Sequence, residues 1–207
     1  MRFSKVVCTG RYFDDGVKLL QREAAARKQG TDHTFLWEEH AASLCERLLD
    51  LKEPRLERVL DRSHSFGPRA ALATALRETF ADEVKEIVHD EGECDVALSL
   101  LSMHWVDDLD AELSAVRGLL KPDSPFLGVM YSSGSLDELR SCLALSDMER
   151  LGGVVPHVSP LITPNSLSIA LQANGFGGVC VDESDSTPTY SSTLTMLDEL
   201  WRMGERG

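Results

Sequence analysis

The sequence has no long hydrophobic run, few basic residues for its acidic content, and no cysteine pair of the CxxC type. No apolar stretch in its 207 residues approaches the roughly 20 residues that a membrane-spanning helix needs. Lys and Arg number 21 against 34 Asp and Glu, so the formal net charge is −13. This charge argues against nucleic acid as the main partner, because phosphate binding needs a cationic face. Five dispersed cysteines predict reduced, mostly buried thiols.

Several catalytic and metal-binding motifs are also missing. The six histidines lack HxxxH or HxD spacing, so no metal site is predicted. There is no GxSxG elbow of the kind that serine hydrolases use. Neither internal repeats nor low-complexity tracts occur, and the hydrophobic content of 43% is that of an ordinary globular domain.

The most informative segment runs from Asp95 to Asp123. Its apolar run over 96–101 predicts a buried strand, which a loop around His104 and Trp105 follows. Apolar residues at helical spacing then predict a helix from Leu109 to Leu120. A turn and a second apolar strand over 126–130 complete a β-loop-α-β unit, which implies that the two strands lie parallel.

Other segments extend this α/β pattern. Helices are expected over 13–29, 35–51, 70–80 and 193–203. A further helix is expected to begin at a capping box formed by Ser135 and Glu138. Another is expected to begin at Thr163-Pro164 and to end just before Gly175. Strands are expected over 56–61, 84–88 and 179–181. We interpret 1–12 as an N-terminal tail and 13–207 as a single domain, with a helical lead-in over 13–52 and an α/β core over 53–207.

The residue order of the central segment is characteristic. The order DVALSxLSxHWVxDL, beginning at Asp95 and followed by LKPD at 120–123, resembles the fourth and fifth strands of class I S-adenosylmethionine-dependent methyltransferases. Within that superfamily the chain is most similar to the mitochondrial complex I assembly factor 5 family. The similarity covers roughly residues 13 to 205 and continues through Pro156-His157-Val158-Ser159-Pro160, Asn174-Gly175-Phe176 and Met203-Gly204-Glu205. It implies a Rossmann-like, mostly parallel sheet preceded by helices.

The resemblance also implies a site for S-adenosylmethionine. The family's first motif, an aspartate followed by a glycine-rich turn, matches Asp61 to Gly67, with Ser63 and Ser65 at two of the glycine positions. By this resemblance the cofactor-binding positions are Asp61, Ser63, Ser65, Gly67, Asp82, Ser99 and Leu100. His104 is the candidate catalytic residue, with a structural role as the alternative.

The middle of the chain is shorter than the family pattern. Only 27 residues separate Gly67 from Asp95, too few for two more strands with their helices. We therefore expect the second and third strands, and also the final strand, to be reduced or missing. The family's acidic residue that binds the cofactor ribose has no match in this interval.

Three functions remain open. The chain is an S-adenosylmethionine-dependent methyltransferase, a docking factor for complex I assembly related to arginine-hydroxylating members, or a truncated inactive product. The resemblance implies a protein client, a complex I subunit, and a location in the mitochondrial matrix, peripheral to the inner membrane. The acidic composition suits a basic client through electrostatic steering.

Overall fold

Four parallel strands form the centre of the fold in the computed structural model, which describes residues 15–28, 35–52, 55–64, 67–81 and 83–205. The strands are β1 (Arg58–Asp61), β2 (Glu86–Val88), β3 (Val96–Leu100) and β4 (Phe126–Val129). They lie in the order β2-β1-β3-β4, and every neighbouring pair is parallel. β3 is buried along its whole length, which explains its continuous apolar run. The predicted parallel pairing of β3 with β4 is confirmed, with Ala97 opposite Phe126.

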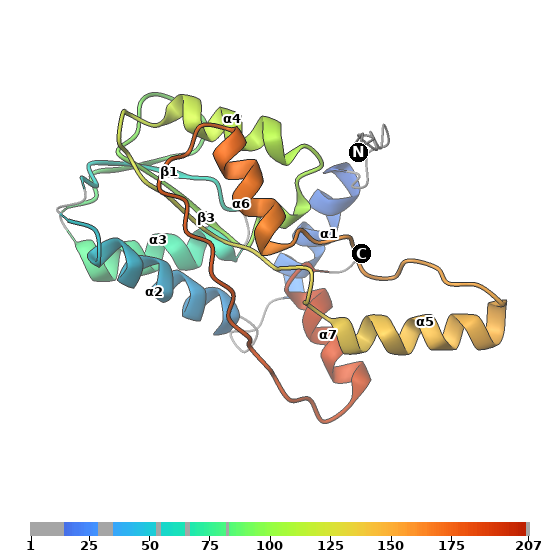
Figure 1. The fold of residues 1–207 in the computed structure, drawn as a ribbon. Helices are drawn as coiled ribbons and strands as arrows, with labels where there is room; N and C mark the ends of the chain where they lie inside the picture. Colours follow the sequence, from blue (N-terminus) through green and yellow to red (C-terminus); the bar gives the residue numbers. More distant parts are fainter. Residues whose placement is uncertain (1–14, 29–34, 53–54, 65–66, 82, 206–207) are drawn as a thin grey trace, which may run out of the picture.

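Helices cover both faces of this sheet. They are α1 (Asp15–Lys28), α2 (Phe35–Leu49), α3 (Pro68–Phe80), α4 (Leu109–Leu119), α5 (Asp137–Leu151), α6 (Pro164–Ala173) and α7 (Thr193–Arg202). A short 3-10 helix, η2 (Met103–Trp105), follows β3. Figure 1 shows α2 and α3 on one side of the sheet and α4 and α6 on the other, while α5 extends away from this body. The predicted α/β class is confirmed.

The core is split by the sheet because alternate strand residues face opposite sides. Val96 and Leu98 of β3 pack with the buried face of α2 and α3, whereas Ala97 packs with Leu113 and Val116 of α4. All five side chains are completely buried. The helices are therefore held mainly by burial of their apolar faces against the sheet, at roughly 25 cal/mol per Å² of apolar surface.

Local capping signals set where several helices begin. The Asp108 carboxylate accepts a hydrogen bond from the Ala111 amide at 2.9 Å, which starts α4 as expected for an N-terminal carboxylate. The Thr163 hydroxyl accepts from the Ser166 amide at 3.2 Å, and Pro164 occupies the first turn of α6. Gly175 follows that helix with φ +82°, as predicted.

Two local predictions are wrong. The capping box at Ser135 and Glu138 does not form, because the Ser135 amide donates to the Ser132 carbonyl in a turn and Leu136, with φ 58°, precedes α5. The strand expected over 179–181 is also absent from the described residues. Its short apolar run follows two glycines, which disfavour a strand, and Asp182 next to it pairs with Arg47 of α2 at 2.6 Å.

The expected shortening of the sheet is confirmed. β2 has three residues, and in the described part of the chain no strand follows β4. The division into a tail, a helical lead-in and an α/β core stays a prediction. Within the described ranges no helix is both long and apolar enough to cross a membrane.

Candidate functional site

The candidate site lies at the carboxyl ends of β1 and β3. β1 has β2 on one side and β3 on the other, so the chain proceeds outward in opposite directions from this point. Open parallel sheets bind ligands in the crevice at such a reversal, because the two loops leave in opposite directions. The loop after β1 and the η2 segment after β3 form the walls of this crevice, which we call the cleft.

The loop after β1 is tied down by its own polar groups. The Asp61 carboxylate accepts a hydrogen bond from the Ser63 amide at 2.7 Å and lies 3.6 Å from Arg69 Nε. Burial raises the pKa of Asp61, although these contacts oppose the rise. The Ser63 hydroxyl accepts from the Leu100 amide at 2.9 Å, and the His64 amide donates to the Ser102 hydroxyl at 2.7 Å. The serine at position 63 therefore closes the gap between β1 and β3.

Gly67 is in contact with an aromatic ring. Its φ is +56°, in the left-handed region that favours glycine, and it immediately precedes α3. A Cβ atom at this position would overlap the six-membered ring of Trp37 from α2. Trp37 is only 2% exposed, so its indole fills the space directly beside the turn.

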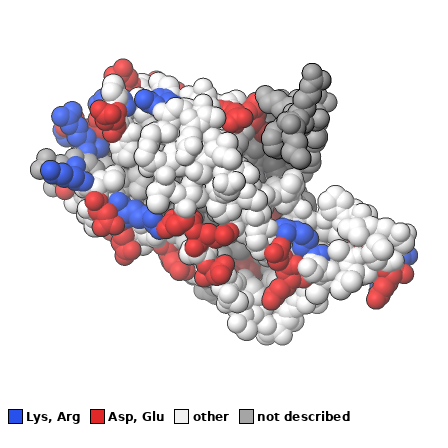
Figure 2. All heavy atoms as spheres, in the orientation of Figure 1, with Lys and Arg blue, Asp and Glu red and all other residues white. Residues whose placement is uncertain are grey.

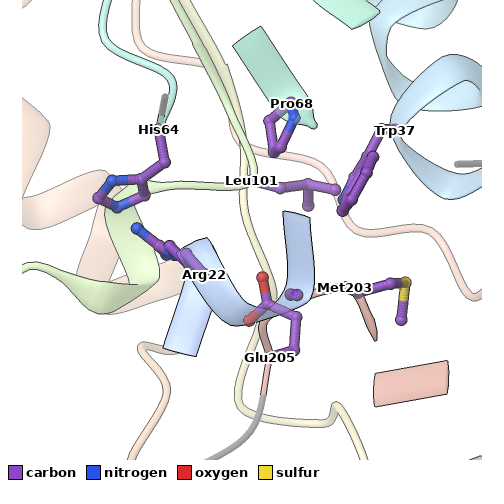
Figure 3. A pocket seen from close by; sticks show the side chains of 8 residues that line it. Arg22, Trp37, His64, Pro68, Leu101, Met203 and Glu205 are labelled. Atoms are coloured by element: carbon purple, nitrogen blue, oxygen red, sulfur yellow. The ribbon is translucent and has the colours of Figure 1, made fainter. Parts of the chain in front are cut away.

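The rest of the cleft is covered by helices from the two ends of the chain. Arg22 and Ala25 of α1 and Met203, just after α7, line the remaining cavity together with Trp37. Figure 3 shows Arg22 extending toward His64 beneath the β1 and β3 loops. The cavity volume is about 10 Å³, which is room for about one water molecule.

The end of α7 directs a carboxylate into this cavity. Gly204 has φ +75°, its amide donates to the Trp201 carbonyl at 3.1 Å, and the Glu205 amide donates to the Leu200 carbonyl at 2.9 Å. These bonds form a Schellman motif, which reverses the chain after the helix. The Glu205 side chain is consequently 8% exposed and lies inside the cleft.

Two side chains of η2 contact that carboxylate. Trp105 Nε1 donates a hydrogen bond to Glu205 Oε2 at 2.7 Å, and His104 Nε2 lies 3.1 Å from the same oxygen. A carboxylate can only accept, so His104 Nε2 carries the hydrogen of this contact. His104 Nδ1 is buried and has no hydrogen-bond partner among the described residues. The ring also packs edge-on against Tyr131, with centroids 4.8 Å apart.

Burial controls the electrostatics of the cleft. It lowers the pKa of His64 from 6.5 to about 3, and the nearby Arg22 and His104 lower it further. It lowers the pKa of Lys18 to about 8 despite attraction from Glu205, and raises that of Tyr131. For Glu205, burial raises the pKa, but contacts with His104, Arg22 and Trp105 outweigh it, so the pKa lies below its ordinary value.

The structure brings some of the predicted cofactor-binding residues to the cleft and leaves others apart. Asp61, Ser63 and Gly67 belong to the end of β1 and the segment between β1 and α3 that forms one wall of the cleft, but none of them lines the remaining cavity, and Leu100 is a fully buried strand residue. Ser99 is also buried, and its hydroxyl has no partner in the described part of the chain. Ser65 and Asp82 lie outside the described residues. The cofactor roles of all seven stay predictions, as does catalysis by His104.

Some residues of the cleft carried no sequence signal for it. Trp37 of α2, Arg22 of α1 and Glu205, just after α7, are distant along the chain, and neither their spacing nor their type pointed to this cleft. Arg62, the residue after Asp61, points away from the cleft. Its guanidinium binds Glu112 of α4 through two bonds of 2.7 and 2.8 Å.

S-adenosylmethionine does not fit the cleft in this structure. Sites for ligands of that size usually have about 300 to 1,000 Å³, whereas the cavity here has about 10 Å³. The indole of Trp37 occupies the close-approach position beside Gly67, and the Ser63 hydroxyl occupies the gap between the strands. We therefore derive no chemical step through this cofactor.

Gly204→Ala is expected to lower the free energy of unfolding by roughly 1–2 kcal/mol, because the residue has a left-handed φ and a Cβ would lie 3.1 Å from Arg22 Cγ. Urea denaturation followed by circular dichroism measures this loss. Gly152→Ala is the matched control, because Gly152 has φ +69° but no atom within 4 Å of an added Cβ. Equal losses in the two variants would show that contact with α1 contributes nothing.

Comparison with known proteins identifies relatives along most of the chain. No family model matches the sequence. The Homo sapiens protein named mitochondrial arginine-hydroxylase NDUFAF5 is 29% identical over 219 residues, which cover 93% of this chain and 63% of the human protein. The Mus musculus protein of the same name is 38% identical over 115 residues, covering 56% of this chain and 34% of that protein.

A Rickettsia prowazekii protein, named as a proposed methyltransferase, is 26% identical over 65% of this chain and 62% of its own length. The chain thus spans less than two thirds of the length of each of these three relatives. The resemblance read from the sequence is confirmed: the chain is a homologue of the proteins named arginine-hydroxylase NDUFAF5.

Proposed function

We propose that this chain acts in the assembly of mitochondrial respiratory complex I as a methyltransferase-like docking protein. The observation that carries the docking role is the closed cleft, in which Trp37, Arg22 and Glu205 occupy the place where the fold would hold a cofactor. A domain of this kind retains a folded surface for a protein client while lacking room for the cofactor. The assembly role and a mitochondrial location are drawn from the family resemblance and from the relatives' names.

The surface offers features that suit a protein client. α5 extends from the body, and three of its apolar side chains, Leu145, Met148 and Leu151, are each more than half exposed. Figure 2 shows that the surface of this extension carries few charged side chains over much of the visible face. Exposed apolar patches of this kind on soluble domains frequently mark protein-binding sites. The net charge of −13 favours a client that is basic around its apolar contact.

The test is recovery of complex I subunits from mitochondria that express the tagged chain. We expect matrix-arm subunits to co-purify, and we expect the double variant Leu145→Asp with Met148→Asp to reduce their recovery at least fivefold by quantitative mass spectrometry. Leu194→Asp in α7 is the matched control, because Leu194 is 78% exposed on another helix. Recovery of no complex I subunit by the unaltered chain would overturn the proposal, as would equal recovery with all variants.

The second candidate function is an S-adenosylmethionine-dependent methyltransferase. Its support is the parallel sheet with a reversal between β1 and β3, together with Asp61 at the end of β1 and Gly67 directly before α3. Isothermal titration with the cofactor separates the two functions. We expect no binding at millimolar cofactor; micromolar binding would show that the cleft opens and would favour the transferase.

A further inference from the structure

Glu205 is bound by side chains that lie far from it in the sequence. Its carboxylate accepts a hydrogen bond from Trp105 at 2.7 Å and lies 3.1 Å from His104 Nε2, and its side chain is almost completely buried. Burying an ionised carboxylate is costly unless donors and opposite charges compensate. The donors and positive charges that compensate Glu205 come from η2 and α1, which are far from it in the sequence. Together they form a pocket for a carboxylate.

The charges around Glu205 are complementary to it. Arg22 and Lys18 of α1 are each 9% exposed, and both interact electrostatically with Glu205. Lys18 Nζ also lies 2.9 Å from the centroid of the Trp105 ring. Burial lowers the pKa of both cationic side chains, while attraction to Glu205 raises it. An anion at this position therefore stabilises two buried cations that would otherwise face each other.

The cleft also contains polar groups that Glu205 leaves without hydrogen bonds. Among the buried nitrogen atoms of the described ranges that have no hydrogen-bond partner are His104 Nδ1, His64 Nε2 and Trp37 Nε1. The His104 side chain is 1% exposed, and His64 and Trp37 line the same small cavity. Unsatisfied buried polar groups are rare in folded proteins and call for an explanation. A ligand larger than one carboxylate group, entering the cavity beside Glu205, would lie against the side chains of His64 and Trp37.

We propose that the cleft is a binding site for the carboxylate group of a small-molecule ligand, formed by Arg22, His104 and Trp105, and that Glu205 occupies this site from within the chain. The ligand must displace the Glu205 side chain, because the cavity beside Glu205 holds about one water molecule. Glu205 and the ligand therefore compete for the same donors. This inference goes beyond the assembly role and does not depend on it.

Removing the internal carboxylate and supplying it in solution tests the site. Glu205→Ala removes a fragment that corresponds to acetate. We expect the melting temperature of this variant to fall by about 5 °C, and 100 mM acetate to restore most of the loss. Acetamide, which has the same shape without the charge, and chloride at the same concentration should restore none of it. Differential scanning fluorimetry of the full chain measures these shifts.

Matched variants separate a specific site from a general salt effect. Glu138→Ala removes an exposed glutamate and should gain nothing from acetate. Trp105→Phe combined with Glu205→Ala keeps an aromatic ring but removes the 2.7 Å donor, so the acetate effect should fall at least threefold. If Glu205→Ala is unfolded in chloride, acetate should restore its near-ultraviolet circular dichroism and acetamide should not.

Direct binding completes the test. By ¹³C-acetate NMR titration, the intact chain should bind acetate at least tenfold more weakly than Glu205→Ala does. Glu205→Gln, whose side chain still fills the site, should also bind weakly. Equal responses to acetate and acetamide, or equal acetate affinity in all variants, would overturn the proposal. Failure to recover complex I subunits would bear on the proposed function and leave this site unaffected.

Discussion

Gly67→Ala is expected to lower the free energy of unfolding by about 3 kcal/mol. Two costs combine at this position: the left-handed φ of +56°, at roughly 1–2 kcal/mol for a residue with a Cβ, and overlap of that Cβ with the Trp37 indole, at roughly 1–3 kcal/mol. The indole is 2% exposed and packed in the core, so it has little freedom to move aside. Urea denaturation at neutral pH measures the loss.

Three further variants separate the two costs. Gly175→Ala shares the positive φ, at +82°, but has no atom within 4 Å of an added Cβ, so its loss reports backbone strain alone. Gly118→Ala lies inside α4 with open space around the Cβ, and it should be neutral or stabilising by up to about 1 kcal/mol. Trp37→Leu should reduce the added cost of Gly67→Ala, which a double-mutant cycle measures. Additivity in that cycle would contradict the contact.

The sheet and the helices on it were predictable because their signals are local. The apolar run of β3, the carboxylate cap of Asp108 and the proline at the start of α6 each act within a few residues of their position in the chain. The parallel pairing of β3 with β4 follows from the α-helix α4, which crosses over between them. The predicted capping box at Ser135 was wrong because the Ser135 amide donates its hydrogen bond to the Ser132 carbonyl instead.

The closed cleft was not predictable in this way. Glu205 contacts His104 across 101 residues of sequence, and Trp37 packs on Gly67 across an interval that includes β1. A glutamate after a helix is ordinary in any sequence. Gly204 favours a Schellman motif at the end of α7, but nothing nearby indicates that this turn will direct Glu205 into the cleft. The sequence did indicate that the glycine-rich turn had changed, and Ser63 shows the consequence, because its hydroxyl binds the Leu100 amide.

His64 is expected to make the chain unusually sensitive to acid. Burial first, then Arg22 of α1 and His104 of η2, lower its pKa from 6.5 to about 3, while Glu205 opposes the shift. In the unfolded chain the same imidazole gains a proton near pH 6.5, so between pH 6.5 and 3 the unfolded state binds more protons than the folded state. The stability that neutral His64 contributes is complete above pH 6.5 and is lost as the pH falls toward 3.

Comparison with His64→Gln isolates this effect. Glutamine stays neutral at every pH. Glu205 and the other acidic groups, whose protonation also lowers the stability of the folded chain, are present in both proteins. We expect the unaltered chain to lose about 3 kcal/mol more than the variant between pH 7 and pH 4, measured by urea denaturation. Parallel stability curves across that range would mean that His64 accepts a proton in the folded chain. The cleft would then be open to water, and Glu205 would not be sealed within it.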